Sequence, residues 1–281
     1  MEKLLEKDEY LSVKKYVKKH DFNNDENLNR ELPTYLLYHL SNLRQNVLNV
    51  ISFSSDDNVL ELSFECESIT PKIAKQVNKV VKLDPSSILC DVSGIILDKE
   101  SITNVKLINS TLDNYKSKLK FSKIILVNVI DNLSYFINDD PTINNLLNIL
   151  RSLIKSNGEI YFATNNKFSI KYLSGEKNEN KKEYFSSLTD SNSLSLEGLK
   201  ILFEENDFDC YFYYPLPDFY FASEIYSDKY LPKEGSIKNI AKSYYDDKFV
   251  LFNANIALNQ AIRENNFQTF APSFLIKVRC K

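Results

Sequence analysis

A short polar segment that follows the first apolar run of the chain has residue types and spacing suited to binding a nucleotide-like cofactor. Residues 59–62 predict a buried strand, and helical spacing of apolar residues begins near residue 69. A second predicted strand, 79–84, ends on Asp84, roughly 20 residues after the first turn. In a doubly wound sheet an acid at this place can accept hydrogen bonds from a cofactor ribose. The frame of residues 59–84 therefore predicts a cofactor site.

The turn between this strand and this helix lacks the glycines that such a site normally contains. Glycines let the backbone bend tightly and come close to a bound cofactor. Here those places hold Ser63, Glu65 and Glu67. All five glycines of the chain lie elsewhere, at Gly94, Gly158, Gly175, Gly198 and Gly235. The pattern therefore predicts a degraded cofactor site.

The acidic residues of the turn bear directly on cofactor binding. If Glu67 lay ~4 Å from a carboxylate of the cofactor, an effective dielectric constant near 20 would give a repulsion of order 4 kcal/mol. That repulsion would weaken binding about a thousandfold. A second interpretation stays open, because Glu65 and Glu67 alternate with Phe64 and Cys66 and could form the solvent side of a longer strand.

The pattern along the chain predicts alternating strands and helices. Strands are expected at 59–63, 80–84, 104–108, 123–129 and 158–164, with two more at 211–214 and 274–278. Helices are expected at 31–50, 70–77, 141–156 and 195–206. This alternation predicts an α/β fold with a doubly wound, mainly parallel, seven-stranded Rossmann-like sheet and a ligand site at the carboxyl ends of the strands.

The chain divides into an N-terminal helical extension, 1–50, and one larger domain, 51–281. Within that domain, residues 171–193 are rich in Lys, Asn, Glu and Ser and predict a flexible insertion. Residues 215–270 are expected to form a helical region on the acceptor side of the sheet.

Several segments resemble class I S-adenosylmethionine-dependent methyltransferases, and more narrowly a bacterial branch associated with glycosyltransferases of surface polysaccharides. Residues 38–49 (YHLSNLRQNVLN) and 59–70 (VLELSFECESIT) are similar to the patterns YHLSxxRxNILxW and VLEIGxGxGAITxxL of that branch. Residues 124–131 resemble IVLxGVLE, and 157–168 resemble GGKLIIAIENKF. The longest match is 213–232, YYPLPDFYFASEIYSDKYLP, which is similar to YYPYPDYKFPTEIYSDEYLP. The glycine loop is the part of this chain that departs from the family.

The resemblance implies S-adenosylmethionine as the cofactor and a set of candidate site residues. The candidate cofactor contacts are Glu61, Ser63, Asp84, Asn128 and Asp131. The candidate acceptor or partner contacts are Asn165, Lys167, Asp218 and Glu224. No catalytic residue is assigned. Plainer alternatives exist for these candidates. Asp84 and Asp131 could cap turns, and the polar residues at 165–167 could form hydrogen bonds with the backbone of a loop.

Composition excludes several other kinds of site. The formal net charge of -3 gives no general attraction for nucleic acid. The basic cluster Lys14, Lys15, Lys18 and Lys19 is expected to be a solvated helix face. No apolar run approaches the ~20 residues that a membrane-spanning helix needs, so a cytoplasmic protein is expected. The four cysteines form no Cys-x-x-Cys pair, so no metal site is expected, and Cys66 is interpreted as a small apolar filler rather than a nucleophile.

Three functional classes remain open at this stage. The first is a methyltransferase-like protein with a degraded cofactor site that acts through a partner, such as a glycosyltransferase or an active paralogue, in surface glycan or polysaccharide modification. The second is an active S-adenosylmethionine-dependent methyltransferase acting on a sugar, a glycan or a small acceptor. The third, an unrelated dinucleotide enzyme, is disfavoured because no glycine lies in the first turn.

Overall fold

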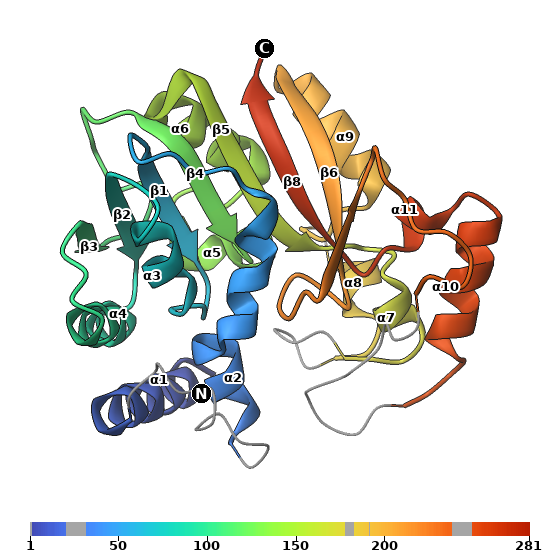
Figure 1. The fold of residues 1–281 in the computed structure, drawn as a ribbon, viewed down its shortest axis with the longest axis horizontal. Coiled ribbons are helices and arrows are strands. Elements are labelled where there is room, and N and C mark those ends of the chain that lie inside the picture. The colour runs from blue at the N-terminus through green and yellow to red at the C-terminus, as the bar shows by residue number, and fades with distance from the viewer. Residues whose placement is uncertain (1, 21–31, 178–182, 191, 238–248) are drawn as a thin grey trace.

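The computed structural model is built around a single eight-stranded sheet, and it describes residues 2–20, 32–177, 183–190, 192–237 and 249–281 (Figure 1). The order of the strands across the sheet is β3-β2-β1-β4-β5-β8-β6-β7. The strands are β1 (Asn58–Ser63), β2 (Lys79–Asp84), β3 (Val105–Asn109), β4 (Phe121–Val127), β5 (Ile154–Asn165), β6 (Phe208–Leu216), β7 (Glu224–Ser227) and β8 (Ser273–Cys280).

The first five strands of the sheet are parallel, and the remaining strands are antiparallel to their neighbours. β8 lies antiparallel between β5 and β6, and β7 pairs antiparallel with β6. The mainly parallel α/β sheet predicted from the sequence is confirmed for β1 to β5. The predicted number of seven strands is wrong, because residues 224–227 extend the sheet by one edge strand.

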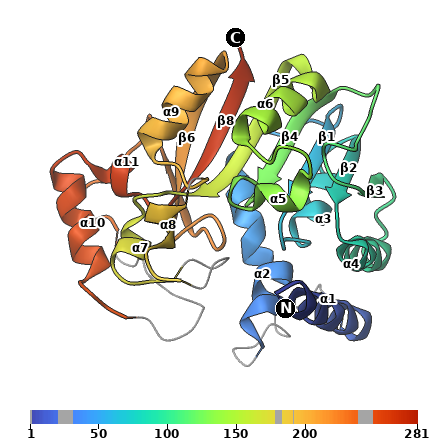
Figure 2. The same cartoon turned by 180° about the vertical axis from the view of Figure 1, so that it is seen from behind.

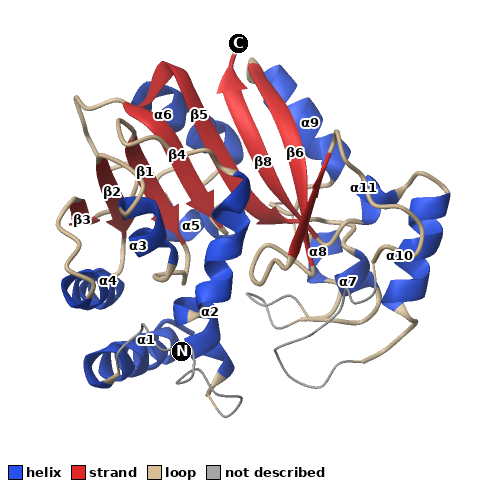
Figure 3. Ribbon diagram, in the orientation of Figure 1, coloured by secondary structure: helices blue, strands red, loops and turns tan. Residues whose placement is uncertain are grey.

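Helices cover both faces of this sheet (Figures 2 and 3). The α-helices are α1 (Glu2–Lys19), α2 (Thr34–Leu40), α3 (Ile69–Ala74), α4 (Ser87–Lys99), α5 (Leu133–Phe136), α6 (Ile143–Leu153), α7 (Ile170–Leu173), α8 (Ser186–Thr189), α9 (Leu196–Glu205), α10 (Ala254–Arg263) and α11 (Phe267–Phe270). The described residues also form two 3-10 helices, η2 (Asn42–Val50) and η3 (Ile130–Asn132). Figure 1 shows α3 in front of the sheet, and Figure 2 shows α6 and α9 on the opposite face.

The N-terminal extension packs against the first half of the domain. Its buried residues Tyr10, Val13 and Val17 form one apolar cluster with Leu89 and Val92 of α4. The single helix predicted for 31–50 is divided in two, because the backbone at Ser41 is extended and its hydroxyl accepts a hydrogen bond from the Leu43 amide. Serine favours such a cap over a helix interior. The extension therefore reaches the carboxyl ends of the strands.

Other predicted boundaries differ by a few residues. The helix predicted at 141–156 ends at Leu153, because residue 154 begins β5. Of the predicted insertion 171–193, the described part contains the end of α7 and all of α8, whereas 178–182 and 191 lie outside the described residues. Region 215–270 contains β7, α10 and α11, and its residues 238–248 are likewise not described. No described helix has the length and apolar character needed to cross a membrane.

Candidate functional site

The candidate site lies where β1 and β2 end, and its first acid, Glu61, is held by neighbouring side chains through one carboxylate oxygen, whereas Oε2 is buried without a hydrogen-bond partner among the described residues. The hydroxyls of Ser63 and Thr70 donate hydrogen bonds of 2.8 and 2.9 Å to Glu61 Oε1. Lys82 Nζ lies 3.5 Å from the same oxygen, and neither side chain is exposed. Glu61 and Lys82 are register partners on β1 and β2, which places these charges side by side. The predicted contacts Glu61 and Ser63 are therefore brought together, inside the protein.

The turn after β1 keeps a backbone conformation typical of glycine although it contains none. Glu65 has φ 49°, in the left-handed region, and Asn128 after β4 has φ 58°. An L-residue in this region costs roughly 1–2 kcal/mol. The carboxylate of Glu65 accepts a hydrogen bond of 3.2 Å from the hydroxyl of Tyr10 on α1. The interpretation of Glu65 and Glu67 as the solvent side of a longer strand is wrong, because β1 ends at Ser63 and Glu67 is fully buried.

Glu67 forms a buried pair with His39 of α2. Glu67 Oε2 lies 2.6 Å from His39 Nδ1, and both side chains are at most 1% exposed. Burial by itself lowers the pKa of His39, but the adjacent carboxylate outweighs burial and raises it. Burial raises the pKa of Glu67, yet His39 and Lys82 outweigh it and hold that pKa below its ordinary value. The pair is therefore an ion pair at mildly acidic pH.

A cation also lies against Cys66 in the same turn. Arg44 Nε of η2 donates a hydrogen bond of 3.2 Å to Cys66 Sγ, and the guanidinium lies 4.7 Å from the ring centre of Tyr220. Burial raises the pKa of the Cys66 thiol despite the nearby Arg44 charge, which disfavours the nucleophilic thiolate. Arg44 is 1% exposed, and among the described residues its two terminal nitrogens have no hydrogen-bond partner.

Asp84, the predicted ribose acid at the end of β2, is closed off by Tyr135 of α5. Its Oδ1 accepts hydrogen bonds of 2.8 Å from both the Ser86 amide and the Tyr135 hydroxyl. The Tyr135 ring also packs edge-on against Phe64, with 5.0 Å between ring centres. No part of Asp84 is exposed, and burial raises its pKa to about 7 although Lys82 opposes the shift. The hydrogen bond from the Ser86 amide shows that Asp84 caps a turn, which was the plainer alternative for this residue in the sequence.

Replacing Asp84 by asparagine should change the pH dependence of stability. Because the pKa of Asp84 rises from 3.8 to about 7 on folding, the folded chain binds more protons than the unfolded chain within that window. The free energy of unfolding contributed by Asp84 therefore falls as the pH rises from 4 to 8. We expect Asp84→Asn to gain about 2–4 kcal/mol relative to the wild type over this range, measured by urea unfolding. A difference that does not vary with pH would contradict the prediction.

The candidates at the ends of β4 and β5 also come together. Asp131 Oδ2 accepts hydrogen bonds from the hydroxyl of Thr164 and from the amide and side chain of Asn165, at 3.2 to 3.3 Å. Asn128 donates its amide hydrogen to Ala163 O over 2.8 Å. The Lys167 amide bonds to the carbonyl of Leu194 in the following loop. The contacts of Asp131 therefore join the β4 end to the β5 end.

The last two candidates have different environments. Asp218 is only 1% exposed. Its Oδ2 accepts a hydrogen bond of 2.9 Å from the Lys171 ammonium, and its Oδ1 accepts hydrogen bonds from the backbone amides of Tyr220 and Phe221. Glu224 is exposed at the start of β7 and accepts a bond from the hydroxyl of Tyr226. Their roles toward an acceptor or partner stay predictions.

Sequence reasoning assigned no site role to four residues that shape this site: Tyr10, His39, Lys82 and Tyr135. Two of them left a signal: Lys82 is a lysine inside an otherwise apolar strand, and His39 lies in the segment 38–49 that resembles a family pattern. Within the described part of the chain, no group of three or more His, Cys, Asp or Glu side chains is placed to hold a metal ion.

No family model and no curated protein matches this sequence. Solved structures with a similar fold include the YcgJ protein from Bacillus subtilis, with a TM-score of 0.47 at 10% identity over 85% of this chain and 98% of that one. An S-adenosylmethionine-dependent methyltransferase from Aquifex aeolicus gives 0.45 at 16% identity over 68% of this chain and 90% of that one.

The N-methyltransferase NodS from Bradyrhizobium japonicum is a third similar structure. In complex with S-adenosyl-L-homocysteine it gives a TM-score of 0.36 at 13% identity, over 55% of this chain and 74% of that one. In the other NodS crystal structure the TM-score is 0.34 at 13% identity, over 41% of this chain and 61% of that one, less than two thirds of its length. These similarities concern the fold.

Proposed function

We propose that this chain is a non-catalytic protein with a methyltransferase-like fold, whose own side chains take the place of S-adenosylmethionine. It acts through a protein partner, a glycosyltransferase or an active paralogue, in the modification of surface glycans or polysaccharides. The observation that carries this proposal is the environment of Asp84, which has no exposed surface and is held by Tyr135. A cofactor ribose would need that carboxylate free.

The charges of the site support the same conclusion. The amino-acid part of S-adenosylmethionine carries an ammonium and a carboxylate, which need oppositely charged or polar contacts. Here Glu61 is already paired with Lys82, and Glu67 is already paired with His39. A cofactor would have to separate two buried pairs, and breaking a buried pair typically costs about 3–5 kcal/mol. The residues present therefore do not fit the cofactor in this arrangement.

The role in glycan modification rests on the resemblance of residues 213–232 to the bacterial methyltransferase branch that accompanies glycosyltransferases. A partner surface is supported by apolar side chains that face solvent. Among the described residues, Phe249 and Val250 are 64% and 65% exposed, and Ile256 of α10 is 62% exposed. Exposed apolar groups of this kind are typical of protein contacts. A cytoplasmic location belongs to the same proposal.

An active methyltransferase acting on a sugar, a glycan or a small acceptor is the second candidate, and Arg44 favours it. A buried guanidinium whose terminal nitrogens have no partner among the described residues is energetically unfavourable. A carboxylate bound beside Cys66 would satisfy those donors, and the cofactor has one. In such a state Asp131 and Asn128, with Asp84 released from Tyr135, would line the remaining contacts.

Calorimetry with S-adenosyl-L-homocysteine separates the two candidates. We expect no heat of binding at millimolar ligand for the folded wild-type chain. The variant Tyr135→Ala serves as the comparison, because it removes the hydroxyl that binds Asp84. If a weakened cofactor site exists, this variant should bind the ligand more tightly than the wild type does. Low-micromolar binding by the wild type would overturn the proposal and establish the second candidate.

A further inference from the structure

One face of the sheet carries a pocket far from the candidate cofactor site. Strand β6 is covered by α9 on one side (Figure 2), whereas no described helix lies in front of β6 and β8 in Figure 1. The pocket has a volume of about 500 Å³. It is lined by Asp209, Cys210, Tyr211, Tyr213, Lys229, Lys277 and Arg279.

This pocket lies on strands β8 and β6, whereas the candidate cofactor site lies on the other side of β5 in the strand order. Lys277 pairs with Tyr161 in the antiparallel β5–β8 ladder, and Glu159 lies two residues earlier on β5, towards the amino end of that strand. The cofactor candidates follow the carboxyl ends of β1, β2 and β4. Binding in the pocket is therefore independent of whether S-adenosylmethionine binds.

Two tyrosine rings form the apolar part of the pocket. Tyr211 and Tyr213 alternate along β6 and point to the same face, with ring centres 5.0 Å apart and planes at 73°. Lys229 Nζ lies 5.9 Å from the centre of the Tyr211 ring, and the Lys229 amide donates to the Tyr211 hydroxyl. Both rings are half-buried. They form a corner rather than a parallel-sided slot.

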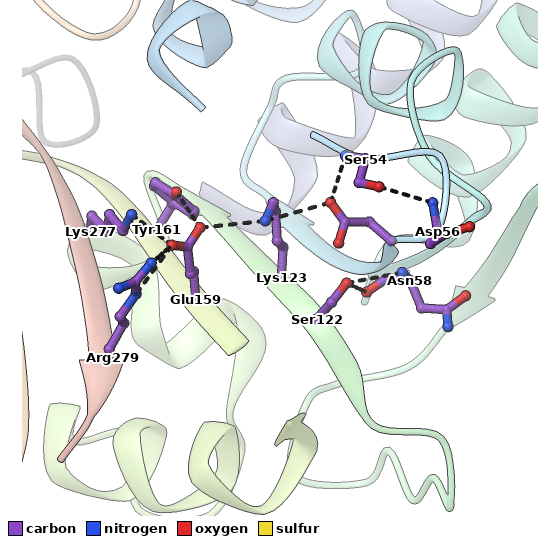
Figure 4. A network of polar contacts seen from close by, with 10 residues as sticks. Ser54, Asp56, Asn58, Ser122, Lys123, Glu159, Tyr161, Lys277 and Arg279 are labelled. Atoms are coloured by element: carbon purple, nitrogen blue, oxygen red, sulfur yellow. Dashed lines mark hydrogen bonds and ion pairs between the residues drawn. The ribbon is translucent and has the colours of Figure 1, made fainter. Parts of the chain in front are cut away.

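The charged wall of the pocket is held in place by one carboxylate, Glu159 (Figure 4). Lys277 Nζ lies 2.6 Å from Glu159 Oε1, and Arg279 binds the same oxygen through Nε and Nη2. Tyr161 donates to Oε2 over 2.7 Å, and Lys123 lies 3.4 Å from that oxygen. These donors outweigh burial and lower the pKa of Glu159 to about 2, so the carboxylate stays ionised and keeps both cations in place.

The pocket region holds more positive than negative charge. Its lining residues include three cations, Lys229, Lys277 and Arg279, and one acid, Asp209. Glu159, which is not a lining residue, binds Lys277 and Arg279. The lining therefore presents more positive than negative charge, which suits an anionic ligand.

We propose that this pocket binds an acidic sugar, a pyranose ring bearing one carboxylate, within a glycan. The apolar C–H face of a pyranose packs on an aromatic ring face, and the corner formed by Tyr211 and Tyr213 contacts such a puckered ring on two sides. The sugar carboxylate then lies against Lys229 and Lys277. A planar base of a nucleotide would stack on only one of the two rings.

Titration with trigalacturonate, followed by NMR or calorimetry at low salt, tests the proposal. We expect a dissociation constant below about 1 mM for trigalacturonate and at least about tenfold weaker binding of neutral maltotriose. Uridine monophosphate tests the nucleotide as an alternative ligand. Tighter binding of uridine monophosphate, equal binding of maltotriose, or no binding of trigalacturonate would each overturn the proposal.

Four variants locate the binding. Tyr211→Ala and Lys229→Ala should each weaken trigalacturonate binding about tenfold, while Tyr211→Phe, which keeps the ring, should bind as the wild type does. Lys75→Ala is the matched control, because Lys75 is a 59% exposed lysine at the end of α3, which packs on β2 rather than on β6 or β8. An equal loss in Lys75→Ala would show that the attraction is unspecific and would contradict the proposal. Circular dichroism of each variant confirms that the fold is intact.

Discussion

Replacing Glu67 by alanine is expected to lower the free energy of unfolding by about 3–5 kcal/mol at pH 5.5. The change removes the carboxylate that keeps the 1% exposed His39 charged, so the buried imidazole must either stay charged without a partner or give up its proton. Leaving one member of a buried pair unpaired costs more than the pair itself contributes. Urea or thermal unfolding at fixed protein concentration measures the loss.

The loss in Glu67→Ala should depend on pH in a defined direction. The pKa of His39 is raised above 6.5 in the folded chain, so its stabilisation is complete below pH 6.5 and is lost as the pH rises through the folded pKa. The pKa of Glu67 is lowered below 4.5, so its stabilisation is complete above pH 4.5 and is lost as the pH falls through the folded pKa. The difference from the wild type should therefore be largest between about pH 4.5 and 6.5.

A surface acid provides the control for this prediction. Glu197 of α9 is 72% exposed and pairs with Lys200 at 2.9 Å, three residues further along the helix. Exposed pairs of this kind contribute about 0–1 kcal/mol. Glu197→Ala should therefore change stability by less than ~1 kcal/mol at every pH. A loss below ~1 kcal/mol for Glu67→Ala at pH 5.5 would show that the pair with His39 contributes little.

Replacing Lys82 by methionine is expected to have a second large effect, a loss of about 3–5 kcal/mol. Lys82 Nζ lies 3.5 Å from Glu61 Oε1 and 3.2 Å from Thr70 Oγ1, and the side chain is not exposed. Methionine fills a similar volume, so the expected loss comes from the uncompensated Glu61 charge rather than from a cavity. Denaturant unfolding at pH 7.5 measures the loss.

The double variant Lys82→Met with Glu61→Gln tests that explanation. Glutamine removes the charge and keeps an oxygen that can accept from the hydroxyls of Ser63 and Thr70. We expect the double variant to recover at least about 2 kcal/mol of the loss, since two neutral side chains can replace a buried pair at little cost. Lys75→Met, a 59% exposed lysine of the neighbouring helix end, should stay within about 1 kcal/mol of the wild type. No recovery in the double variant would mean that Lys82 acts through packing instead.

The interior of the sheet was predictable because strand and helix periodicity is a local property of the sequence. The strands at 59–63, 80–84 and 123–129 lie within two residues of β1, β2 and β4. Burial of parallel strands on both faces requires nearly continuous apolar runs, and such runs are visible in the sequence. The edge strand β7 was missed because it has only four residues and none of them is buried.

The positions of the candidate residues were predictable from the sequence, but their contacts were not. Glu61, Ser63, Asp84 and Asp131 were placed at strand ends because strands end where their apolar runs end. Their partners were not predictable, because each belongs to another element far along the chain. Tyr10 lies 55 residues from Glu65, Tyr135 lies 51 residues from Asp84, and His39 lies 28 residues from Glu67. No local pattern reports such contacts.

The sequence by itself determined an α/β sheet, the strand ends at which the candidate residues lie, and the replacement of glycine by charged residues at the first turn. Each of these depends on residue type and short-range spacing, which the chain carries wherever it is folded. Only the tertiary structure decided what those charges do. The N-terminal extension and α5 pack over the turn and bring His39, Tyr10 and Tyr135 within hydrogen-bonding distance of the acids. Because buried carboxylates require such partners, the pairing between distant segments is what determines whether this edge of the sheet is free to bind a ligand.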